Sequence, residues 1–136
     1  MPAQTFLSFD FGTRRVGVAV GNSLLGQAQA LKTVAAEGDA RFAALATLIG
    51  EWQPDALVVG VPCHPDGAPH DNTLRARRFA RQLHGRFRLP VHEVDERYTT
   101  TEALSLGASD ADAAAAALIL AQFLRHLPKP ADDAAA

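Results

Sequence analysis

The sequence predicts a mixed, three-layer α/β fold, and three observations lead to this prediction. Three strand-like segments come first, between residues 5 and 34. Helical and strand-like segments then alternate from residue 39 to residue 126. The run from Ala56 to Val61 is continuously apolar, as expected of a strand that is covered on both faces. The chain has 136 residues, of which 48% are hydrophobic, and this is enough for one domain with one core.

The first three strands are expected to form a meander. Residues 5–10 and 16–20 read as strands rich in apolar side chains, and Gly12 and Thr13 lie between them, which predicts an antiparallel hairpin. A second turn covers residues 21–26. Residues 27–34 alternate polar with apolar side chains, which predicts a third strand.

The rest of the chain alternates helices with strands. Apolar side chains recur at helical spacing in residues 39–52, and Pro54 ends this helix. A second helix from Asn72 carries one apolar face, formed by Ala76, Phe79, Ala80, Leu83 and Phe87. The further elements are a loop (62–70), a short strand (91–94), a short helix opened by a Thr99–Glu102 capping box, and a last helix (112–126). We expect one domain over residues 1–127 and a disordered tail over residues 128–136.

Three acidic residues stand at the ends of predicted elements. Asp10 ends the first strand, Glu96 follows the strand at 91–94, and Asp112 opens the last helix on its sheet-facing side. In open α/β sheets, ligands bind beyond the carboxyl ends of the parallel strands. Carboxylates there suit Mg²⁺ or Mn²⁺, and two such ions can drive phosphodiester hydrolysis. The pattern favours a metal site on these three acids.

Each acid also has a simpler explanation. Asp10 could accept hydrogen bonds from the turn amides of residues 12–14. Glu96 could pair with Arg97, and Asp112 could complete a capping box that Ser109 begins. Spacing alone leaves these alternatives open.

Arginines are concentrated in the helix that begins at Asn72. Six arginines and no acid fall between Leu74 and Arg88. With the apolar face turned inwards, Arg77, Arg78, Arg81 and Arg88 point outwards, and such a stripe can follow the phosphates of a nucleic acid. Arg14 and Arg15 lie just beyond Asp10 and could contact phosphates near the cleaved bond. The alternative is an ordinary solvated helix face.

Four segments in a fixed order resemble the YqgF (RuvX-like) family of nucleases with a ribonuclease H fold. They are FDFGTRRVGVAVGN, LVVGVPCHPDG, DERYTTTEA and DADAAAAALILAQFL, and the likeness spans residues 6–124. It implies a five-stranded sheet in the order 3-2-1-4-5 with strand 2 antiparallel. It also implies catalytic and metal-binding roles for Asp10, Glu96 and Asp112, with Asp95 the less favoured ligand. Arg97 and Thr100 would contact the substrate or the loop at Glu96.

The resemblance implies a metal-dependent endonuclease that acts on structured nucleic acid, above all at the 5′ end of precursor 16S rRNA. Ribosomal precursor particles would then be partners. A Holliday-junction resolvase acting on branched DNA is the alternative, and a noncatalytic nucleic-acid-binding assembly factor is the third. The ATP-binding actin and sugar-kinase class opens with a similar hairpin but needs two such domains. The sequence decides neither between RNA and a DNA junction nor between monomer and homodimer.

Two segments depart from the family pattern. The stretch LGASDAD (106–112) is short and acidic where many relatives have a basic loop. Cys63 and His64 occupy a loop where relatives tend to have apolar residues, and His64 with His70 lacks further ligands for a zinc site.

The remaining sequence features bear on where in the cell the protein acts and on its partners. Cys63 is the only cysteine, so an internal disulfide is excluded. No apolar segment reaches the length of about 18 residues that crosses a bilayer, and the N-terminus lacks the pattern of a signal peptide. We expect a cytoplasmic protein without a membrane partner. The net charge of −2 indicates no particular partner.

Overall fold

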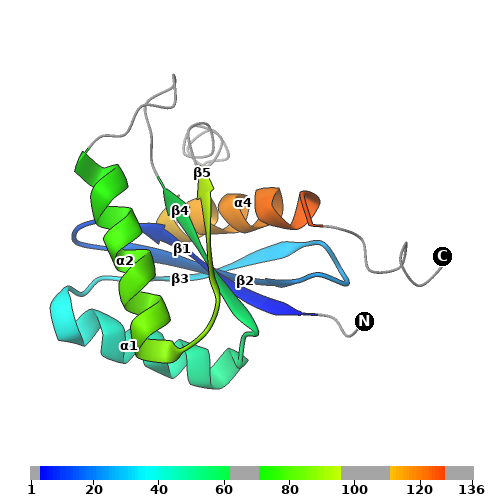
Figure 1. Ribbon diagram of the computed structural model, residues 1–136. Coiled ribbons are helices and arrows are strands. Elements are labelled where there is room, and N and C mark those ends of the chain that lie inside the picture. The colour runs from blue at the N-terminus through cyan, green and yellow to red at the C-terminus, as the bar shows by residue number, and fades with distance from the viewer. Residues whose placement is uncertain (1–3, 62–70, 96–110, 128–136) are drawn as a thin grey trace.

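The computed structural model describes residues 4–61, 71–95 and 111–127. These residues form a five-stranded sheet in the order β3-β2-β1-β4-β5 (Figure 1). β1 pairs antiparallel with β2, and β2 with β3, whereas β4 lies parallel to both β1 and β5. The predicted strand order and orientations are confirmed. The strands are β1 (Thr5–Phe11), β2 (Val16–Asn22), β3 (Ala28–Val34), β4 (Ala56–Val61) and β5 (Val91–Asp95).

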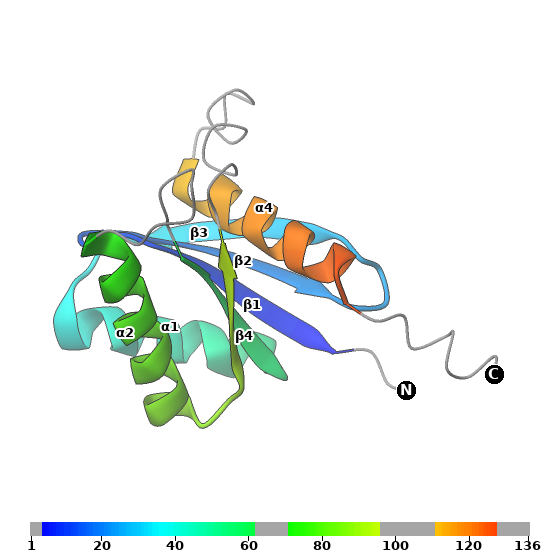
Figure 2. The same ribbon diagram turned by 45° about the horizontal axis from the view of Figure 1, so that its top comes forward.

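Helices cover both faces of the sheet, so the predicted three-layer arrangement is confirmed. α1 and α2 pack on one face and α4 on the other (Figures 1 and 2). Their bounds are α1 (Gly38–Trp52), α2 (Asp71–Phe87) and α4 (Ala111–Arg125), each within one residue of the predicted start. None of the described helices is long and apolar enough to span a membrane. The predicted loop at 62–70 with Cys63 and His64, the short helix after Thr99 and the tail at 128–136 lie outside the described residues.

Alternation along β1 divides the core into two parts. Leu7 and Phe9 join the larger apolar cluster beneath α1 and α2, where Phe79 of α2 is in contact with three other rings. The ring centroid of Phe79 lies 6.1, 5.2 and 5.9 Å from those of Phe9, Phe11 and Phe42. Phe6 joins the smaller cluster on the α4 side. Because successive strand residues point to opposite faces, Asp10 belongs to the same face as Phe6.

α4 lies unusually close to the sheet because the facing residues are small. A Cβ atom at Gly17 of β2 would overlap the carbonyl oxygen of Asp112 and lie 2.8 Å from the amide nitrogen of Ala113. The buried Ser8 hydroxyl donates a 2.7 Å hydrogen bond to the carbonyl of Ala116. The buried inner face of α4 begins with three alanines, Ala113, Ala115 and Ala116. The first turns of α4 are therefore fixed directly on β1 and β2.

Two side chains of α1 differ in burial from what an amphipathic helix predicts. Trp52, which completes the apolar helical pattern, is 40% exposed in the last turn of the helix. Arg41 is buried, with 5% of its surface exposed. A helix face predicted from apolar spacing thus contains one charged residue, whose surroundings are part of the candidate site.

Candidate active site

The sheet register brings Asp10 and Asp112 to the same place. Asp10 of β1 lies directly opposite Gly17 of β2. The backbone of Asp112, in the first turn of α4, rests on that same glycine. Both aspartates are half-buried, and Asp10 belongs to the sheet face that α4 covers. Two of the three predicted acids, far apart in the sequence, are therefore neighbours at one end of the sheet.

The pairing of the parallel strands relates Asp10 to the end of β5. Asp10 lies opposite Gly60 of β4, and Gly60 lies opposite Val94 of β5. Val94 packs in the cluster on the α4 side, so it shares a face with Asp10. Asp95 follows on the opposite pleat. Glu96, Arg97 and Thr100 lie outside the described residues, and their roles stay predictions.

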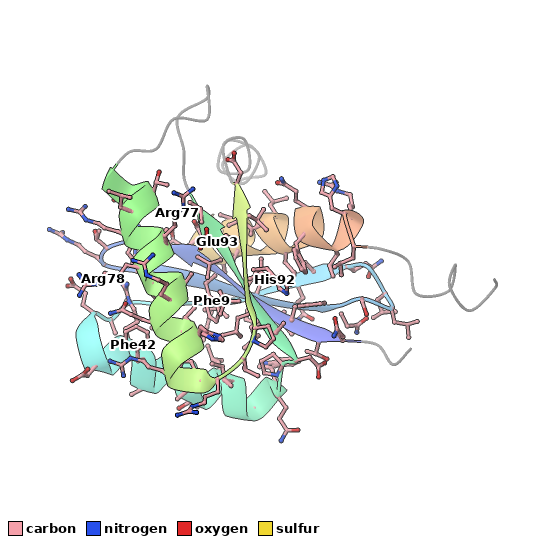
Figure 3. The ribbon with its side chains drawn as sticks, viewed as in Figure 1. Phe9, Phe42, Arg77, Arg78, His92 and Glu93 are labelled. Atoms are coloured by element: carbon pink, nitrogen blue, oxygen red, sulfur yellow. The ribbon has the colours of Figure 1, made fainter. Side chains whose placement is uncertain are left out.

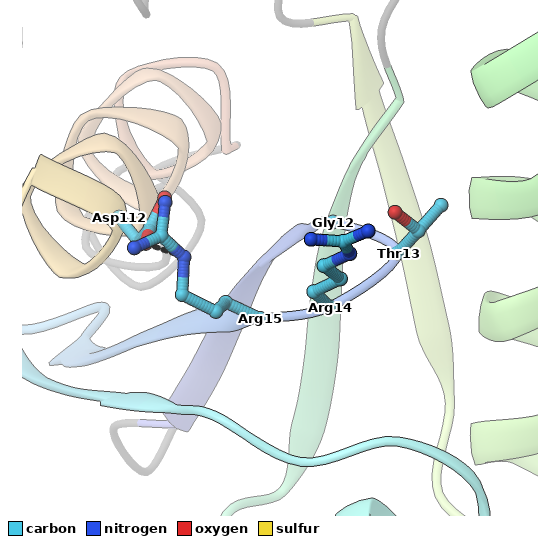
Figure 4. A pocket seen from close by; sticks show the side chains of 5 residues that line it. All are labelled: Gly12, Thr13, Arg14, Arg15 and Asp112. Carbon is cyan, nitrogen blue, oxygen red and sulfur yellow. Dashed lines mark ion pairs between the residues drawn. The ribbon is translucent and has the colours of Figure 1, made fainter.

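A pocket opens between the β1–β2 turn and the first turn of α4 (Figure 4). Its volume is about 440 Å³, and its lining combines turn residues with one carboxylate: Gly12, Thr13, Arg14, Arg15 and Asp112. The Nε atom of Arg15 lies 3.2 Å from Oδ2 of Asp112. The N-terminal end of a helix favours negative charge, so α4 itself also stabilises the Asp112 carboxylate. Cationic turn residues and an acid thus meet in one open pocket.

Buried Arg41 supports the turn from beneath. Its Nε donates a 2.8 Å hydrogen bond to the carbonyl of Ala36, and its Nη2 donates a 3.2 Å bond to the carbonyl of Thr13. The guanidinium carbon also lies 5.6 Å from the ring centroid of Phe11. Burial lowers the pKa of Arg41, and the nearby Glu37 carboxylate opposes this effect. The β1–β2 turn is therefore tied to α1.

Arg41 is not among the site residues predicted from the sequence. The available signal was its spacing of four residues from Leu45, which places it on the inner face of α1. A charged residue on that face needs partners, and here two backbone carbonyls and a ring supply them.

The described acids fit a magnesium-type site only in part. Among residues 4–61, 71–95 and 111–127, no group of three or more Asp, Glu, His or Cys residues is close enough to hold a metal ion. Mg²⁺, however, is often held by one or two carboxylates, with waters and substrate phosphates completing its shell. Asp10 and Asp112 match that donor chemistry. A third protein ligand would have to come from outside the described residues.

The arginines of α2 point outwards, as predicted, but Arg77 has an acidic partner. Arg77, Arg78 and Arg81 are exposed. The Nε atom of Arg77 lies 3.5 Å from Oε1 of Glu93 on β5, and Figure 3 shows the two side chains approaching each other. The absence of acids between Leu74 and Arg88 concerns the sequence of the helix alone, and the partner of Arg77 comes from another element. Arg78 and Arg81 make no ion pair within the described part of the chain.

Arg86 in the last turn of α2 and Arg88 just after the helix differ from Arg78 and Arg81 in their contacts or backbone conformation. Arg86 contacts Asp39 of α1, with 3.6 Å between Nη2 and Oδ1. Its guanidinium carbon also lies 4.1 Å from the ring centroid of Phe42. Arg88 follows the helix in a left-handed conformation, with φ of 58°. Among the arginines predicted to point outwards, Arg78, Arg81 and Arg88 are therefore exposed and make no ion pair with the described residues.

Comparison with solved structures supports the same fold. The chain resembles Thermus thermophilus RuvC in complex with a Holliday junction substrate, with a TM-score of 0.54 and 18% identity. The match covers 90% of this chain and 95% of RuvC. A second T. thermophilus RuvC structure gives a TM-score of 0.53 at 16% identity. At this level of identity the likeness concerns the fold, which is that of the RuvC nucleases.

Comparison of sequences shows the family. The family model described as "RuvX: Holliday junction resolvase" matches residues 4–126, and the chain belongs to this family. A protein of Albidiferax ferrireducens is 72% identical over 91% of this chain and 80% of its own length. A protein of Polaromonas sp. strain JS666 is 65% identical over 92% and 91%, respectively. Both are named "Putative pre-16S rRNA nuclease". The family recognised from the four motifs is confirmed, and it is a family of nucleases.

Proposed function

We propose that this protein is a metal-dependent endonuclease that trims the 5′ end of precursor 16S rRNA. The names of its close relatives support the substrate. The observation that carries the chemistry is that Asp10 and Asp112 both lie next to Gly17. A pair of carboxylates near the carboxyl end of β1, which is parallel to β4, and next to two arginines suits a negatively charged phosphodiester better than a neutral substrate.

Asp10 and Asp112 would hold Mg²⁺ or Mn²⁺, and Glu96 is the third ligand that the family resemblance proposes. When bound, such an ion polarises the phosphoryl oxygen and makes a bound water more acidic. The protein contributes the positions of its carboxylates. Asp10 is fixed by the β1 ladder, and Asp112 by the close contact of α4 with β2.

Basic residues would orient the nucleic acid on this site. Arg14 and Arg15 line the pocket beside Asp112, where a phosphate next to the cleaved bond would lie. Arg41 keeps their turn in place through the Thr13 carbonyl. Arg97 and Thr100, which follow Glu96 in the sequence, are proposed to contact the same phosphates.

The exposed arginines of α2 would hold a more distant part of the backbone. Arg78 and Arg81 offer bidentate donors to phosphates. Arg77 can join them, because its ion pair with Glu93 is long and half-exposed and such pairs contribute little. Ribosomal precursor particles in the cytoplasm are the proposed setting for this contact.

A second function is favoured by two of the comparisons. The family model carries the description of a Holliday junction resolvase, and a matched RuvC structure holds a junction. Cutting two symmetric strands of a junction would favour a homodimer, whereas trimming an rRNA precursor would not require one. A noncatalytic assembly factor would bind RNA without turnover.

A direct comparison of substrates tests these functions. We would incubate the purified protein with a precursor-like 16S RNA and with a four-way DNA junction, each with Mn²⁺ or with EDTA. The proposal predicts Mn²⁺-dependent cleavage of the RNA at a discrete position, and loss of cleavage in Asp10→Asn. Cleavage of the junction alone would favour the resolvase. RNA binding without cleavage of either substrate would favour the assembly factor.

A further inference from the structure

Arg15 and Asp112 form an ion pair between two elements of the proposed site. Arg15 directly precedes β2, Asp112 lies in the first turn of α4, and 3.2 Å separates Nε from Oδ2. Figure 4 shows the Arg15 side chain directed towards Asp112, whereas Arg14 extends elsewhere. Arg14 lines the same pocket but makes no ion pair within the described residues. The two neighbouring arginines therefore differ in one defined contact.

A guanidinium and a divalent cation compete for the negative charge of one carboxylate, that of Asp112. Mg²⁺ binds a carboxylate oxygen directly, at about 2.0–2.1 Å. A bound cation would also repel the guanidinium only a few ångströms away. The contact between Arg15 and Oδ2 is therefore weakened when Asp112 becomes a metal ligand.

The exposure of the pair makes such an exchange easy. The Arg15 side chain is 65% exposed, and that of Asp112 is 32% exposed. Exposed ion pairs of this kind contribute little to stability, so a divalent cation can displace the arginine. The released guanidinium stays within the pocket turn, where it can form a bidentate contact with a phosphate.

We propose that Arg15 alternates between two anionic partners. It neutralises Asp112 in the metal-free protein and binds a substrate phosphate once a divalent cation has taken that carboxylate. The inference rests on the proposed function, because it takes Asp112 to be a metal ligand. Metal binding then has two effects on the site, because it supplies the cation and also releases a side chain that can bind phosphate.

Calorimetric titration with Mn²⁺ tests the competition. Wild type is compared with Arg15→Gln and with Arg14→Gln, which removes the same charge from the same turn without breaking an ion pair. Arg15→Gln should tighten Mn²⁺ binding about two- to fivefold more than Arg14→Gln does, which is the range expected for an exposed pair. Equal affinities of the two variants overturn the inference and leave the proposed function standing. Absence of Mn²⁺ binding by wild type overturns both.

RNA binding in EDTA tests the same exchange without metal. Fluorescence anisotropy with the precursor-like RNA gives the affinity lost through Arg15→Gln, in wild type and in an Asp112→Asn background whose fold is checked by circular dichroism. Arg15→Gln should cost about two- to fivefold more in the Asp112→Asn background, where Arg15 is already released. Arg14→Gln should cost the same in both backgrounds. Equal costs for Arg15→Gln would show that Asp112 does not restrain this arginine.

Discussion

Replacing Gly17 with alanine should move the two aspartates apart while leaving both of them unsubstituted. Gly17 lies between Asp10, its partner across the β1–β2 ladder, and the backbone of Asp112. The added methyl group would overlap the Asp112 carbonyl oxygen and lie 2.8 Å from the amide nitrogen of Ala113. These neighbours are backbone atoms, so they cannot turn aside as a flexible side chain could. The first turn of α4 has to move away from β2.

The size of the effect follows from this contact. Favourable non-bonded contacts lie at about 3.5–4.0 Å, so relieving the overlap with the Asp112 carbonyl requires the first turn to withdraw by about 1–2 Å. Overpacking of this kind costs about 1–3 kcal/mol of unfolding free energy. A misplacement of about 1 Å in a catalytic group can lower the rate about 100-fold. We therefore expect a folded protein whose activity falls much further than its stability.

Urea unfolding and Mn²⁺-dependent RNA cleavage would be measured together. Gly50→Ala is the matched control, because a methyl group at Gly50 of α1 meets no atom within 4 Å. In a helix this control should stabilise the protein by about 0.5–1 kcal/mol and leave cleavage unchanged. If Gly17→Ala cleaves RNA at the wild-type rate, the geometry of α4 on β2 does not position the site as argued.

Three further experiments test the supports of the site and its basic surface. Ser8→Ala removes the buried hydrogen bond to the Ala116 carbonyl and should lower the unfolding free energy by about 1 kcal/mol in urea, with an unchanged m value; an unchanged midpoint would contradict this. Arg41→Met leaves the Thr13 and Ala36 carbonyls without the guanidinium donor, so the unfolding free energy should fall by about 2–3 kcal/mol in the same assay. A decrease below about 1 kcal/mol would refute the anchoring role of Arg41. Arg78→Gln combined with Arg81→Gln should weaken RNA binding and reduce the slope of log affinity against log salt by about 1.5–2. Lys32→Gln, at an exposed position of β3, is the control and should leave this slope unchanged. An equal slope in both variants would show that α2 is not part of the RNA interface.

The order and type of the described elements could be predicted because each has a strong local signal. The apolar run at Ala56–Val61 and the turn at Gly12 and Thr13 define strands without reference to the rest of the chain. The site was predicted in part. Asp10 and Asp112 could be placed at one end of the sheet because both end or begin an element there.

Features that depend on packing between distant segments could not be predicted. The partnership of Arg77 with Glu93 arises because α2 lies beside β5, and no local pattern contains that information. The burial of Arg41 depends on the carbonyl of Thr13, far away in the sequence. Gly17 likewise looked like an ordinary strand residue, although the approach of α4 allows no side chain there.

The central claim is that Asp10 and Asp112 share one divalent cation, and a double-mutant cycle of Mn²⁺ affinity tests it most directly. Calorimetry would compare wild type, Asp10→Asn, Asp112→Asn and the double variant. We predict that each single substitution weakens Mn²⁺ binding by about tenfold or more, and that the double variant loses far less than the product of the two single effects. Unchanged affinity in either single variant, or single effects that multiply in full, would contradict a shared ion.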